Sequence, residues 1–325
     1  MRAGAKLIEM EFIQFYPFTL AERRTGTPPI PVIRGRVLNT WGEDILEKYG
    51  IADFEEAIAK NRDLLTRVVM QEMMRINADH LLLYVELDEE NVVNELMQYL
   101  GLRQPLKVAP ATHFSMGGVL ADTHGWTGVP GLFVAGEAMG GIHGANRLAN
   151  NALTSAAVFG FRAGARAAEA AHNADVHIDT GVARDIAEKL REVLPKQSSR
   201  IKPQELRARL SSYAWLCLGP IRSKESIEKF LEVAEDIRQS IHEVSTETRI
   251  DLLNRLELVN TLIIATSIAR SAYLRQESRG AHFRADYPNE EDSYTNNVAI
   301  TKLAEGDRIE VFVDSRSNIF KARDR

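Results

Sequence analysis

The chain has 325 residues, of which 45% are hydrophobic and 26% are charged, a composition typical of a soluble globular protein with two or three domains. Its formal net charge of −5 at pH 7 argues against nucleic acid as a partner, because such proteins carry a strongly basic surface. The single cysteine, Cys217, excludes an intrachain disulfide and an iron–sulfur cluster ligated by cysteines of this chain alone.

The first part of the chain predicts a strand, a loop and a long helix. Residues 7–15 (LIEMEFIQF) predict a buried strand that ends at Tyr16-Pro17. Residues 21–36 predict a loop because five of them are proline or glycine. Asp53 predicts the N-cap of a helix that runs to about residue 75, and residues 81–86 predict a further strand.

The middle of the chain alternates apolar runs with glycine turns. Residues 91–100, closed by Gly101, predict a second helix with a glycine C-cap. Residues 108–122 hold a Met-Gly-Gly turn between apolar flanks, and residues 132–135 predict a strand. Residues 152–172 are rich in alanine and glycine, which predicts a helix built for close packing against a sheet or a cofactor.

From residue 182 the composition changes to long, charged, amphipathic segments, which predict a helical bundle. The predicted helices cover residues 182–193, 203–218, 223–244 and 247–278. Residues 285–325 are polar and end in a strand-like run at 308–313. No apolar run approaches the roughly 20 residues of a membrane span, and the first residues lack a signal-peptide pattern, so we expect a cytoplasmic protein.

The most informative segment is 131–160, GLFVAGEAMGGIHGANRLANNALTSAAVFG. Its apolar run ends at Gly136-Glu137, and a loop with three further glycines then carries Arg147 to a helix that begins near Asn151. Proteins use this order of elements to bring backbone N–H groups against an anionic ligand or cofactor. Glu137 is a candidate acceptor for cofactor ribose hydroxyls, and a capping or surface carboxylate is the alternative.

Three cationic or titratable side chains lie where a ligand could approach. His113 precedes the Met-Gly-Gly turn, where glycines let a flat ring come close; it either binds a substrate carboxylate or is a core histidine. Arg147 either clamps a carboxylate through two hydrogen bonds or forms a structural ion pair. Arg34 lies in a proline-bracketed loop, and the residues alone favour a surface position. No HxH or HExxH spacing predicts a metal site.

Several segments, in order, resemble the succinate dehydrogenase/fumarate reductase flavoprotein family, whose superfamily includes L-aspartate oxidase. Residues 2–17 resemble the segment that leads into the family's capping domain, and residues 36–50 resemble the stretch that follows. The run at 107–165, with the Met-Gly-Gly turn and the glycine loop, is the most specific part. Residues 254–288 continue the same order.

The resemblance implies a fold of class α/β plus α: a partial FAD-binding α/β domain, an α+β capping domain and a C-terminal helical bundle. The implied divisions are the end of the FAD-binding domain at 1–17, the capping domain at 18–106, the second half of the FAD-binding domain at 107–173, the helical domain at 174–285 and a C-terminal tail at 286–325. The family's N-terminal strand–GxGxxG–helix, which holds the FAD pyrophosphate, is not in this sequence, so we expect about half of a flavin domain.

The resemblance further implies an FAD enzyme that moves a hydride between flavin and a C4 dicarboxylate, oxidising succinate or reducing fumarate. It implies that His113 and Arg147 bind the substrate carboxylates and that Arg34 transfers the proton at the substrate carbon. Gly136 and Glu137 belong to the FAD site, with Glu137 on the ribose. A helix N-terminus presents backbone to the flavin pyrimidine edge through Asn151, Ala152 and Leu153.

The implied partners are an iron–sulfur subunit, which takes the electrons, and a separate chain with the N-terminal half of the flavin domain. Through such a complex the cytoplasmic chain would be peripheral to the inner membrane. Neither partner is nucleic acid, and the substrate is a small dicarboxylate.

Two departures from the family pattern leave alternatives open. The family's substrate-binding histidine is Tyr16 here, and a phenol donates a hydrogen bond but does not become a cation near neutral pH. The family's Arg-Gly-Glu-Gly-Gly run is shortened to Arg34-Gly35-Arg36, without the glutamate that relays protons. The second interpretation is therefore an L-aspartate oxidase-like enzyme or an oxidoreductase for another carboxylate. The third is a non-catalytic, partner-binding protein with a vestigial flavin site.

Overall fold

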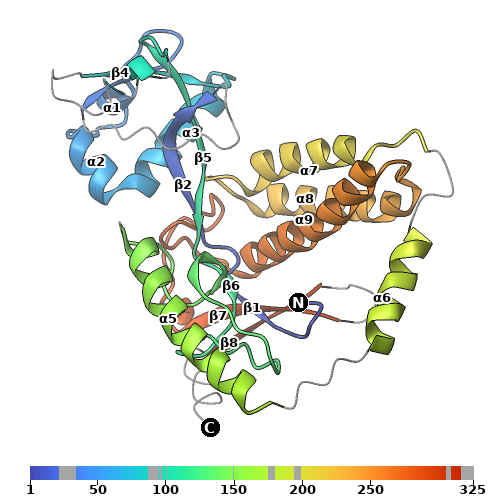
Figure 1. Cartoon of the computed structure of the whole chain (residues 1–325). Coiled ribbons are helices and arrows are strands. Elements are labelled where there is room, and N and C mark those ends of the chain that lie inside the picture. Colours follow the sequence, from blue (N-terminus) through green and yellow to red (C-terminus); the bar gives the residue numbers. More distant parts are fainter. Residues whose placement is uncertain are drawn as a thin grey trace.

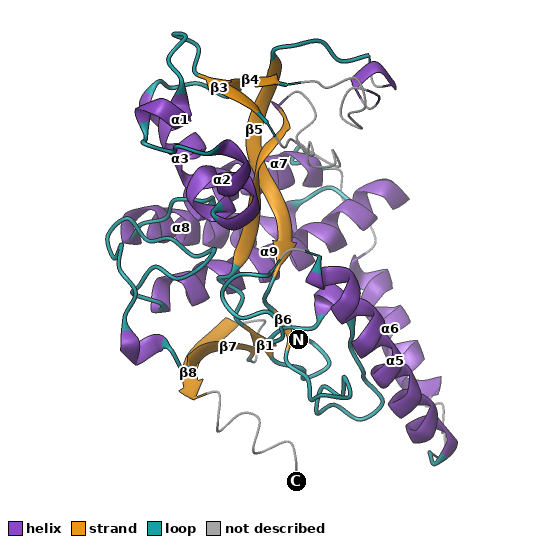
Figure 2. Ribbon diagram, turned by 90° about the vertical axis from the view of Figure 1, so that its left-hand side faces the viewer, coloured by secondary structure: helices purple, strands orange, loops and turns teal. Residues whose placement is uncertain are grey.

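The computed structural model shows an upper lobe of sheet and short helices, which two long strands join to a lower region of sheet, loops and longer helices (Figures 1 and 2). It describes residues 1–21, 34–86, 95, 97–99, 101–148, 150–174, 180–193, 199–304 and 309–315. The mixed helix and sheet content agrees with the expected fold class, while the domain boundaries remain a prediction. Most of the loop predicted at 21–36 and of the helix predicted at 91–100 lies outside the described residues.

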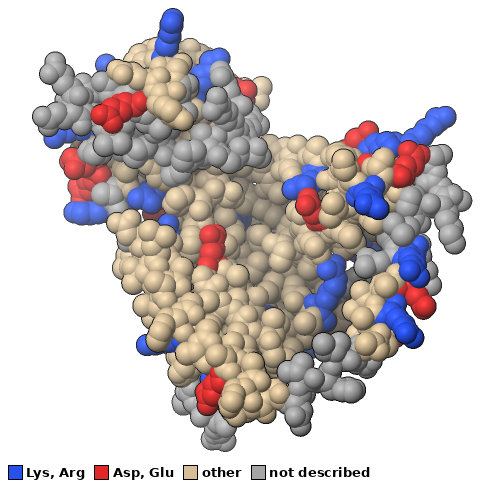
Figure 3. All heavy atoms as spheres, viewed as in Figure 1, with Lys and Arg blue, Asp and Glu red and all other residues tan. Residues whose placement is uncertain are grey.

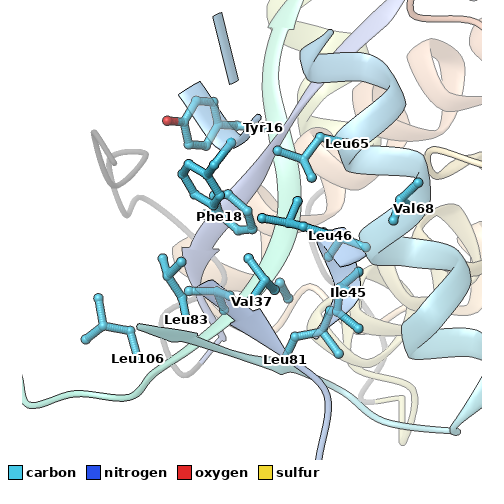
Figure 4. Packing of buried hydrophobic residues seen from close by; sticks show 14 of the residues in the cluster. Tyr16, Phe18, Val37, Ile45, Leu46, Leu65, Val68, Leu81, Leu83 and Leu106 are labelled. Atoms are coloured by element: carbon cyan, nitrogen blue, oxygen red, sulfur yellow. The ribbon is translucent and has the colours of Figure 1, made fainter. Parts of the chain in front are cut away.

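The upper lobe is a four-stranded antiparallel sheet covered by helices. Its strand order is β2-β5-β4-β3, with β2 at Ile13–Leu20, β5 at Leu106–Ser115, β4 at Leu81–Val85 and β3 at Gly35–Leu38. Its helices are α1 (Ile45–Lys48), α2 (Phe54–Lys60) and α3 (Arg62–Arg75). Alternate residues of β2 point into one core, where Phe18 packs with Val37 and Leu65 (Figure 4). The lobe therefore has a hydrophobic core of its own.

The strand predicted at 7–15 is divided in the structure. Glu9 adopts a positive φ of 59°, which separates β1 (Leu7–Ile8) from β2. β2 also continues through Pro17 instead of ending there. Proline removes a ladder hydrogen bond, but β2 is an edge strand with a register shift between Tyr16 and Thr19, where proline is tolerated.

The long helix predicted from Asp53 consists of α2 and α3. The Asp53 side chain accepts a hydrogen bond from the Glu56 N–H, as expected of an N-cap. At Asn61 the backbone leaves the helical region, with φ −119° and ψ 36°, so Arg62 becomes the first residue of α3. Apolar residues continue at helical spacing on both sides of the break, so the sequence pattern does not reveal it.

A second sheet joins strands from both ends of the chain in the order β6-β1-β7-β8. β6 covers Gly118–Val119, β7 covers Asn297–Leu303, and β8 covers Ile309–Ser315, close to the strand predicted at 308–313. The strand predicted at 132–135 is wrong: in the described residues a single bridge joins Phe133 to Trp126. An apolar run cannot by itself supply a partner strand.

The helical bundle is confirmed, with one core shared by α7 (Pro203–Leu218), α8 (Lys224–Ser240) and α9 (Arg249–Leu274). Ser223 caps α8 through reciprocal hydrogen bonds with Ser226. α8 and α9 end before the predicted residues, and a 3-10 turn, η3 (Ile241–Glu243), follows α8. α5 (Asn151–His172) and α6 (Thr180–Val193) lie apart from this bundle (Figure 1). The described residues also include the short 3-10 turns η2 (Gly136–Ala138) and η4 (Asp292–Tyr294).

α9 corrects one expectation. The sequence led us to expect no segment apolar enough for a membrane span, but α9 is long and apolar enough to cross a membrane. In the described part of the chain, one helix meets this test. Its residues Leu258, Leu262 and Ala269 are buried in the bundle core, 28% of its apolar window is buried, and one helix of this kind is weak evidence for a membrane span. Length and hydropathy alone therefore do not make α9 a membrane span.

A buried carboxylate connects α3 to the loop before α1. Glu72 accepts hydrogen bonds from Arg75 Nη2 at 2.7 Å, from Asn39 Nδ2 at 2.6 Å and from the Tyr49 hydroxyl at 3.0 Å. The hydrogen bond from Arg75, followed by the neutral donors, lowers the pKa of Glu72 from 4.5 to about 2. Ionised Glu72 therefore stabilises the folded upper lobe.

Glu72→Ala is expected to lower the free energy of unfolding by about 2 kcal/mol at pH 7, because it removes a buried acceptor of hydrogen bonds from Arg75, Asn39 and the Tyr49 hydroxyl. Since folding lowers this pKa, the stabilisation is complete above about pH 4.5 and is lost as the pH falls toward 2. Urea unfolding at pH 7 and pH 3 measures the difference between the variant and the wild type. Glu235→Ala is the control: the pKa of Glu235 is also about 2, but its partner Arg238 is exposed, so the expected cost is below about 1 kcal/mol. An equal loss of unfolding free energy in the two variants would contradict the stabilising role of Glu72.

Candidate active site

Tyr16 and His113 are neighbours where β2 and β5 leave the upper lobe. The register pairs Gln14 with Phe114 and Phe15 with Thr112, so His113 is the extra residue of a β-bulge. A bulge turns its extra side chain out of the regular alternation. The His113 and Tyr16 rings lie 5.7 Å apart, centroid to centroid. The structure thus brings two of the predicted substrate-binding residues together.

Arg147 is buried against the same two strands, with 8% of its surface exposed. Its Nη2 donates to Gln14 Oε1 at 2.7 Å, and its Cζ lies 4.5 Å from the centroid of the Phe114 ring. Gln14 Nε2 donates in turn to Asn146 Oδ1 at 2.9 Å and to the Arg147 carbonyl at 3.1 Å. Within the described residues, the buried Arg147 Nε–H has no acceptor. A buried donor without a partner is costly, so this position is suited to an anionic ligand.

A second guanidinium, that of Arg62, approaches the same place from α3. Its Cζ lies 5.3 Å from the centroid of the Tyr16 ring, and its Nε donates to the Ile58 carbonyl at 3.2 Å. Burial, and then the positive charges of Arg147 and Arg62, lower the pKa of His113. Burial and the charge of Arg62 likewise lower the pKa of Arg147. The site therefore holds two repelling cations and a neutral imidazole, an arrangement that a dianion would stabilise.

The Tyr16 hydroxyl stays protonated in this setting. Burial raises the pKa of the phenol, although the nearby Arg62 acts in the opposite direction. Tyr16 is thus a neutral hydrogen-bond donor at the position where the family pattern has a histidine.

Arg34 lies far from this cluster. β3 and β2 are the two opposite edges of the sheet. Gly35, next to Arg34, pairs with Val85, which lies two residues past Leu83 along β4. Leu83 itself pairs with Leu106, at the start of β5. His113 is seven residues further along β5 than Leu106, roughly 23 Å at the rise of a strand. Arg34 is exposed, and its carbonyl accepts a hydrogen bond from the Glu86 N–H at 3.1 Å. The structure does not bring Arg34 to the position that its implied role requires.

A cleft of about 1140 Å³ opens between β5, the end of α3 and α7, and His113 and Glu137 are among the residues that line it. Figure 3 shows this face hollowed between the upper lobe and the bundle, with mostly uncharged residues around the hollow. Glu137 is exposed, and its Oε1 accepts a hydrogen bond from the Ser115 N–H at 2.9 Å. This bond attaches η2 to the end of β5 and leaves the carboxylate accessible.

The predicted cofactor residues at the start of α5 form an open helix N-terminus. Asn150 adopts a left-handed conformation with φ 65°, and no side chain in the described part of the chain caps the helix. Leu153 is 81% exposed. The backbone N–H groups of Ala152 and Leu153 therefore point, with the positive end of the helix dipole, to a place that a ligand can reach.

The glycines divide into two groups. A Cβ on Gly117 would lie 2.2 Å from the Glu9 carbonyl oxygen, and one on Gly118 would lie 2.4 Å from the Ala138 carbonyl oxygen. These two glycines let backbone segments pack together, so the expected room for a flat ring is not found there. By contrast, a Cβ on Gly144 would meet nothing within 4 Å, and one on Gly136 would meet only Ala156 of α5, at 3.9 Å.

The donor set on this side of the chain fits FAD. Glu137 offers a carboxylate oxygen to sugar hydroxyls, and the uncapped start of α5 offers N–H groups to an electronegative ring edge. The open space at Gly136 and Gly144 is compatible with the same ligand.

The sequence patterns do not single out Gln14 and Arg62. In the sequence Gln14 is one residue of a predicted strand, although it holds both the side chain and the backbone of Arg147. Arg62 has a usable signal: it is a cation in the first turn of a helix, where the helix dipole disfavours positive charge. That signal becomes visible only once the break at Asn61 is known.

Comparisons with known proteins agree with this geometry. A family model described as "FAD binding domain" matches residues 1–153, and one described as "Fumarate reductase flavoprotein C-term" matches residues 207–320. A fumarate reductase (CoM/CoB) protein of Methanothermobacter marburgensis is 32% identical over 94% of this chain and 58% of its own length. The fumarate reductase flavoprotein of Haemophilus influenzae is 30% identical over 90% of this chain and 54% of its own length.

L-aspartate oxidase of Yersinia pestis is 28% identical over 89% of this chain and 55% of its own length. Among solved structures, the Mycobacterium smegmatis Sdh1 complex matches with a TM-score of 0.80 and 25% identity, over 97% of this chain and 56% of that one. The chain thus spans about half the length of the relatives that it matches. FAD is the cofactor that the model matching residues 1–153 names. The chain belongs to the succinate dehydrogenase/fumarate reductase flavoprotein family.

Proposed function

We propose that this chain forms the substrate site, and part of the FAD site, of an oxidoreductase that acts on a C4 dicarboxylate such as succinate or fumarate. The observation that supports this most is the pair of guanidiniums, Arg147 and Arg62, beside the neutral donors Tyr16 and His113. Two cations and two neutral donors match a small dianion with a carboxylate at each end.

Each residue has a separate part in this proposal. Arg147 and His113 bind the substrate carboxylates, and the unpaired Arg147 Nε–H supplies a donor that the described residues leave free. The Tyr16 hydroxyl donates a further hydrogen bond. Among the described residues, Arg62 is the guanidinium of the upper lobe that reaches this cluster, and in this proposal it donates the proton to the substrate carbon when fumarate is reduced. Arg34, at the far edge of the same lobe, does not.

On the other side of the site, Glu137 would hold the FAD ribose, and Asn151, Ala152 and Leu153 would present their backbone to the flavin ring. Gly136 lies beside α5 and lets the chain turn there with φ 71°. When bound, FAD supplies the exchange of two electrons with the substrate. This chain's own residues orient the dicarboxylate and handle its proton.

We propose that the active enzyme contains further polypeptide that covers α5. Several apolar side chains along α5 are exposed, with Leu153 at 81%, Phe161 at 80% and Val158 at 42%. Such exposure is unusual for a helix rich in small residues unless another surface packs on it. A chain with the nucleotide-binding half of a flavin domain would cover this side, and an iron–sulfur subunit would take the electrons. The assembly would be soluble, or peripheral to the inner membrane through its other subunits.

An L-aspartate oxidase-like enzyme, or one for another carboxylate, is the second candidate, and Tyr16 is the observation that favours it. A neutral phenol in place of a titratable imidazole changes the charge that the site offers to its ligand. A screen of fumarate, succinate and L-aspartate with the assembled enzyme distinguishes the two candidates.

Visible absorption tests the proposal. We expect no flavin bands from the purified chain alone, and flavin bands after co-expression with a chain that carries a strand–GxGxxG–helix. Glu137→Gln should weaken flavin retention in the pair, whereas Glu188→Gln, on the exposed side of α6, should not. A colourless pair would instead support a non-catalytic, partner-binding protein. Flavin retained by the chain alone would contradict the need for a second polypeptide.

A further inference from the structure

A tight turn after α9, residues 279–282, packs against the loop that carries Arg147. The Ala281 N–H donates to the Ala145 carbonyl at 3.0 Å, and Arg279 and His282 close the turn through backbone hydrogen bonds of 2.8 and 3.0 Å. Gly280 has a φ of +55°, and a Cβ there would lie 2.5 Å from the Ala145 carbonyl oxygen. The turn therefore touches the backbone two residues before Arg147, with no room for a side chain between them.

Two fully buried side chains hold this turn in place. Arg222, between α7 and α8, donates from Nη1 to His282 Nδ1 at 2.8 Å and to the Glu11 carbonyl at 2.7 Å. Its Nε donates to the Leu218 carbonyl at 3.1 Å, at the end of α7. Because an arginine can only donate, His282 Nδ1 is the acceptor and the imidazole is neutral. Burial and the surrounding cations lower the pKa of His282 well below its ordinary value, in agreement with that tautomer.

A second path of contact runs through aromatic rings. His282 packs edge to face on Phe12, with centroids 6.3 Å apart and planes at 87°. Phe12 shares a small core with Phe114 and Met116, against which Ala145 and Ala281 also pack. The Phe114 ring lies directly under the Arg147 guanidinium. The turn therefore reaches Arg147 both through the backbone at Ala145 and through the ring that supports its side chain.

We propose that the 279–282 turn, held by Arg222 and His282, is a positioning element for Arg147, so that the helical bundle sets the geometry of the carboxylate site. This inference rests on the proposed function through the carboxylate-binding role of Arg147. Neither Arg222 nor His282 touches the substrate in this proposal, because both are buried behind Phe12 and Glu11.

Hydrogen exchange tests the positioning without any ligand. In the full chain, Gly280→Ala is expected to speed amide exchange in the segment 143–148, because the added methyl displaces the Ala145 carbonyl. Gly50→Ala is the matched control: Gly50 also has a positive φ, of 68°, but a Cβ there meets nothing within 4 Å. Both variants carry the same kind of backbone strain. If exchange in 143–148 is equally fast in the two variants, the turn does not hold the loop.

Kinetics of the assembled flavoprotein with fumarate test the consequence for the site. Gly280→Ala should raise the KM for fumarate about 10- to 100-fold, whereas Gly50→Ala should leave it within about twofold. His282→Asn, which keeps an acceptor for Arg222, should retain more of the wild-type KM than His282→Leu. Wild-type enzyme that uses neither fumarate nor succinate would contradict the proposed function, while the exchange result would still test the turn. Wild-type activity with equal KM values for the two glycine variants would overturn the positioning role alone.

Discussion

Arg147→Ala is expected to lower kcat/KM of the assembled flavoprotein for fumarate or succinate about a thousandfold, or roughly 4 kcal/mol of transition-state stabilisation. Arg147 is buried, rests on the Phe114 ring, and has an Nε–H for which the described residues supply no acceptor. Among the described residues, its removal leaves the neutral donors Tyr16 and His113 and the Arg62 guanidinium to bind the substrate carboxylate. Steady-state kinetics of the purified variant measure the loss.

Arg238→Ala is a control for the loss of one positive charge. Arg238 lies on α8, is exposed, and pairs with Glu235 at 2.6 Å, so kcat/KM should stay near the wild-type value. If Arg147→Ala keeps turnover within about tenfold, roughly 1.4 kcal/mol, the assignment of the carboxylate site is wrong.

The second large effect concerns the choice between two guanidiniums of the upper lobe. Arg62→Gln is expected to lower kcat by about 100-fold or more, with a smaller change in KM, because a residue that transfers the proton acts in the transition state. Arg34→Gln is expected to stay within about threefold, because Arg34 lies at the opposite edge and end of the sheet. Parallel kinetics of the two variants at several pH values give the comparison.

Lys60→Gln supplies the matched control for Arg62. Lys60 lies two residues away at the end of α2, is 74% exposed, and pairs only loosely with Glu56 at 3.3 Å. It changes the net charge near the site by the same amount without contact with Tyr16. Loss of activity in Arg34→Gln together with normal activity in Arg62→Gln would show that Arg62 does not transfer the proton.

Capping residues in the sequence correctly predict where helices begin. Asp53 and Ser223 are both expected to begin helices, and each accepts the hydrogen bond that defines an N-cap. The helix after the glycine loop begins at Asn151, and the bundle helices follow their apolar spacing. These features depend on residues within one or two turns of one another. A single sequence is therefore sufficient to predict these helix starts and this spacing.

The members of the candidate site are more predictable than its geometry. The family motifs place Tyr16, His113 and Arg147 at the substrate, and the structure groups the three. What the motifs cannot supply is Gln14, which lies 133 residues from Arg147 in sequence and yet holds it at 2.7 Å. Nor do they single out Arg62: the family motif assigns the proton transfer to Arg34, which precedes β3 at the far edge of the sheet, whereas Arg62 begins α3 and lies near Tyr16.

The amino-acid sequence by itself thus determined the family, the helix starts and the residue types available for carboxylate and flavin binding, because these depend on local hydrogen bonding, periodicity and motif order. The tertiary structure alone settled the break after Glu9, the bulge at His113, the approach of Arg62 to Tyr16 and the contact of Gly280 with Ala145. Each of these depends on how segments far apart in the chain pack and share backbone hydrogen bonds, and such packing leaves no periodic signal in either segment.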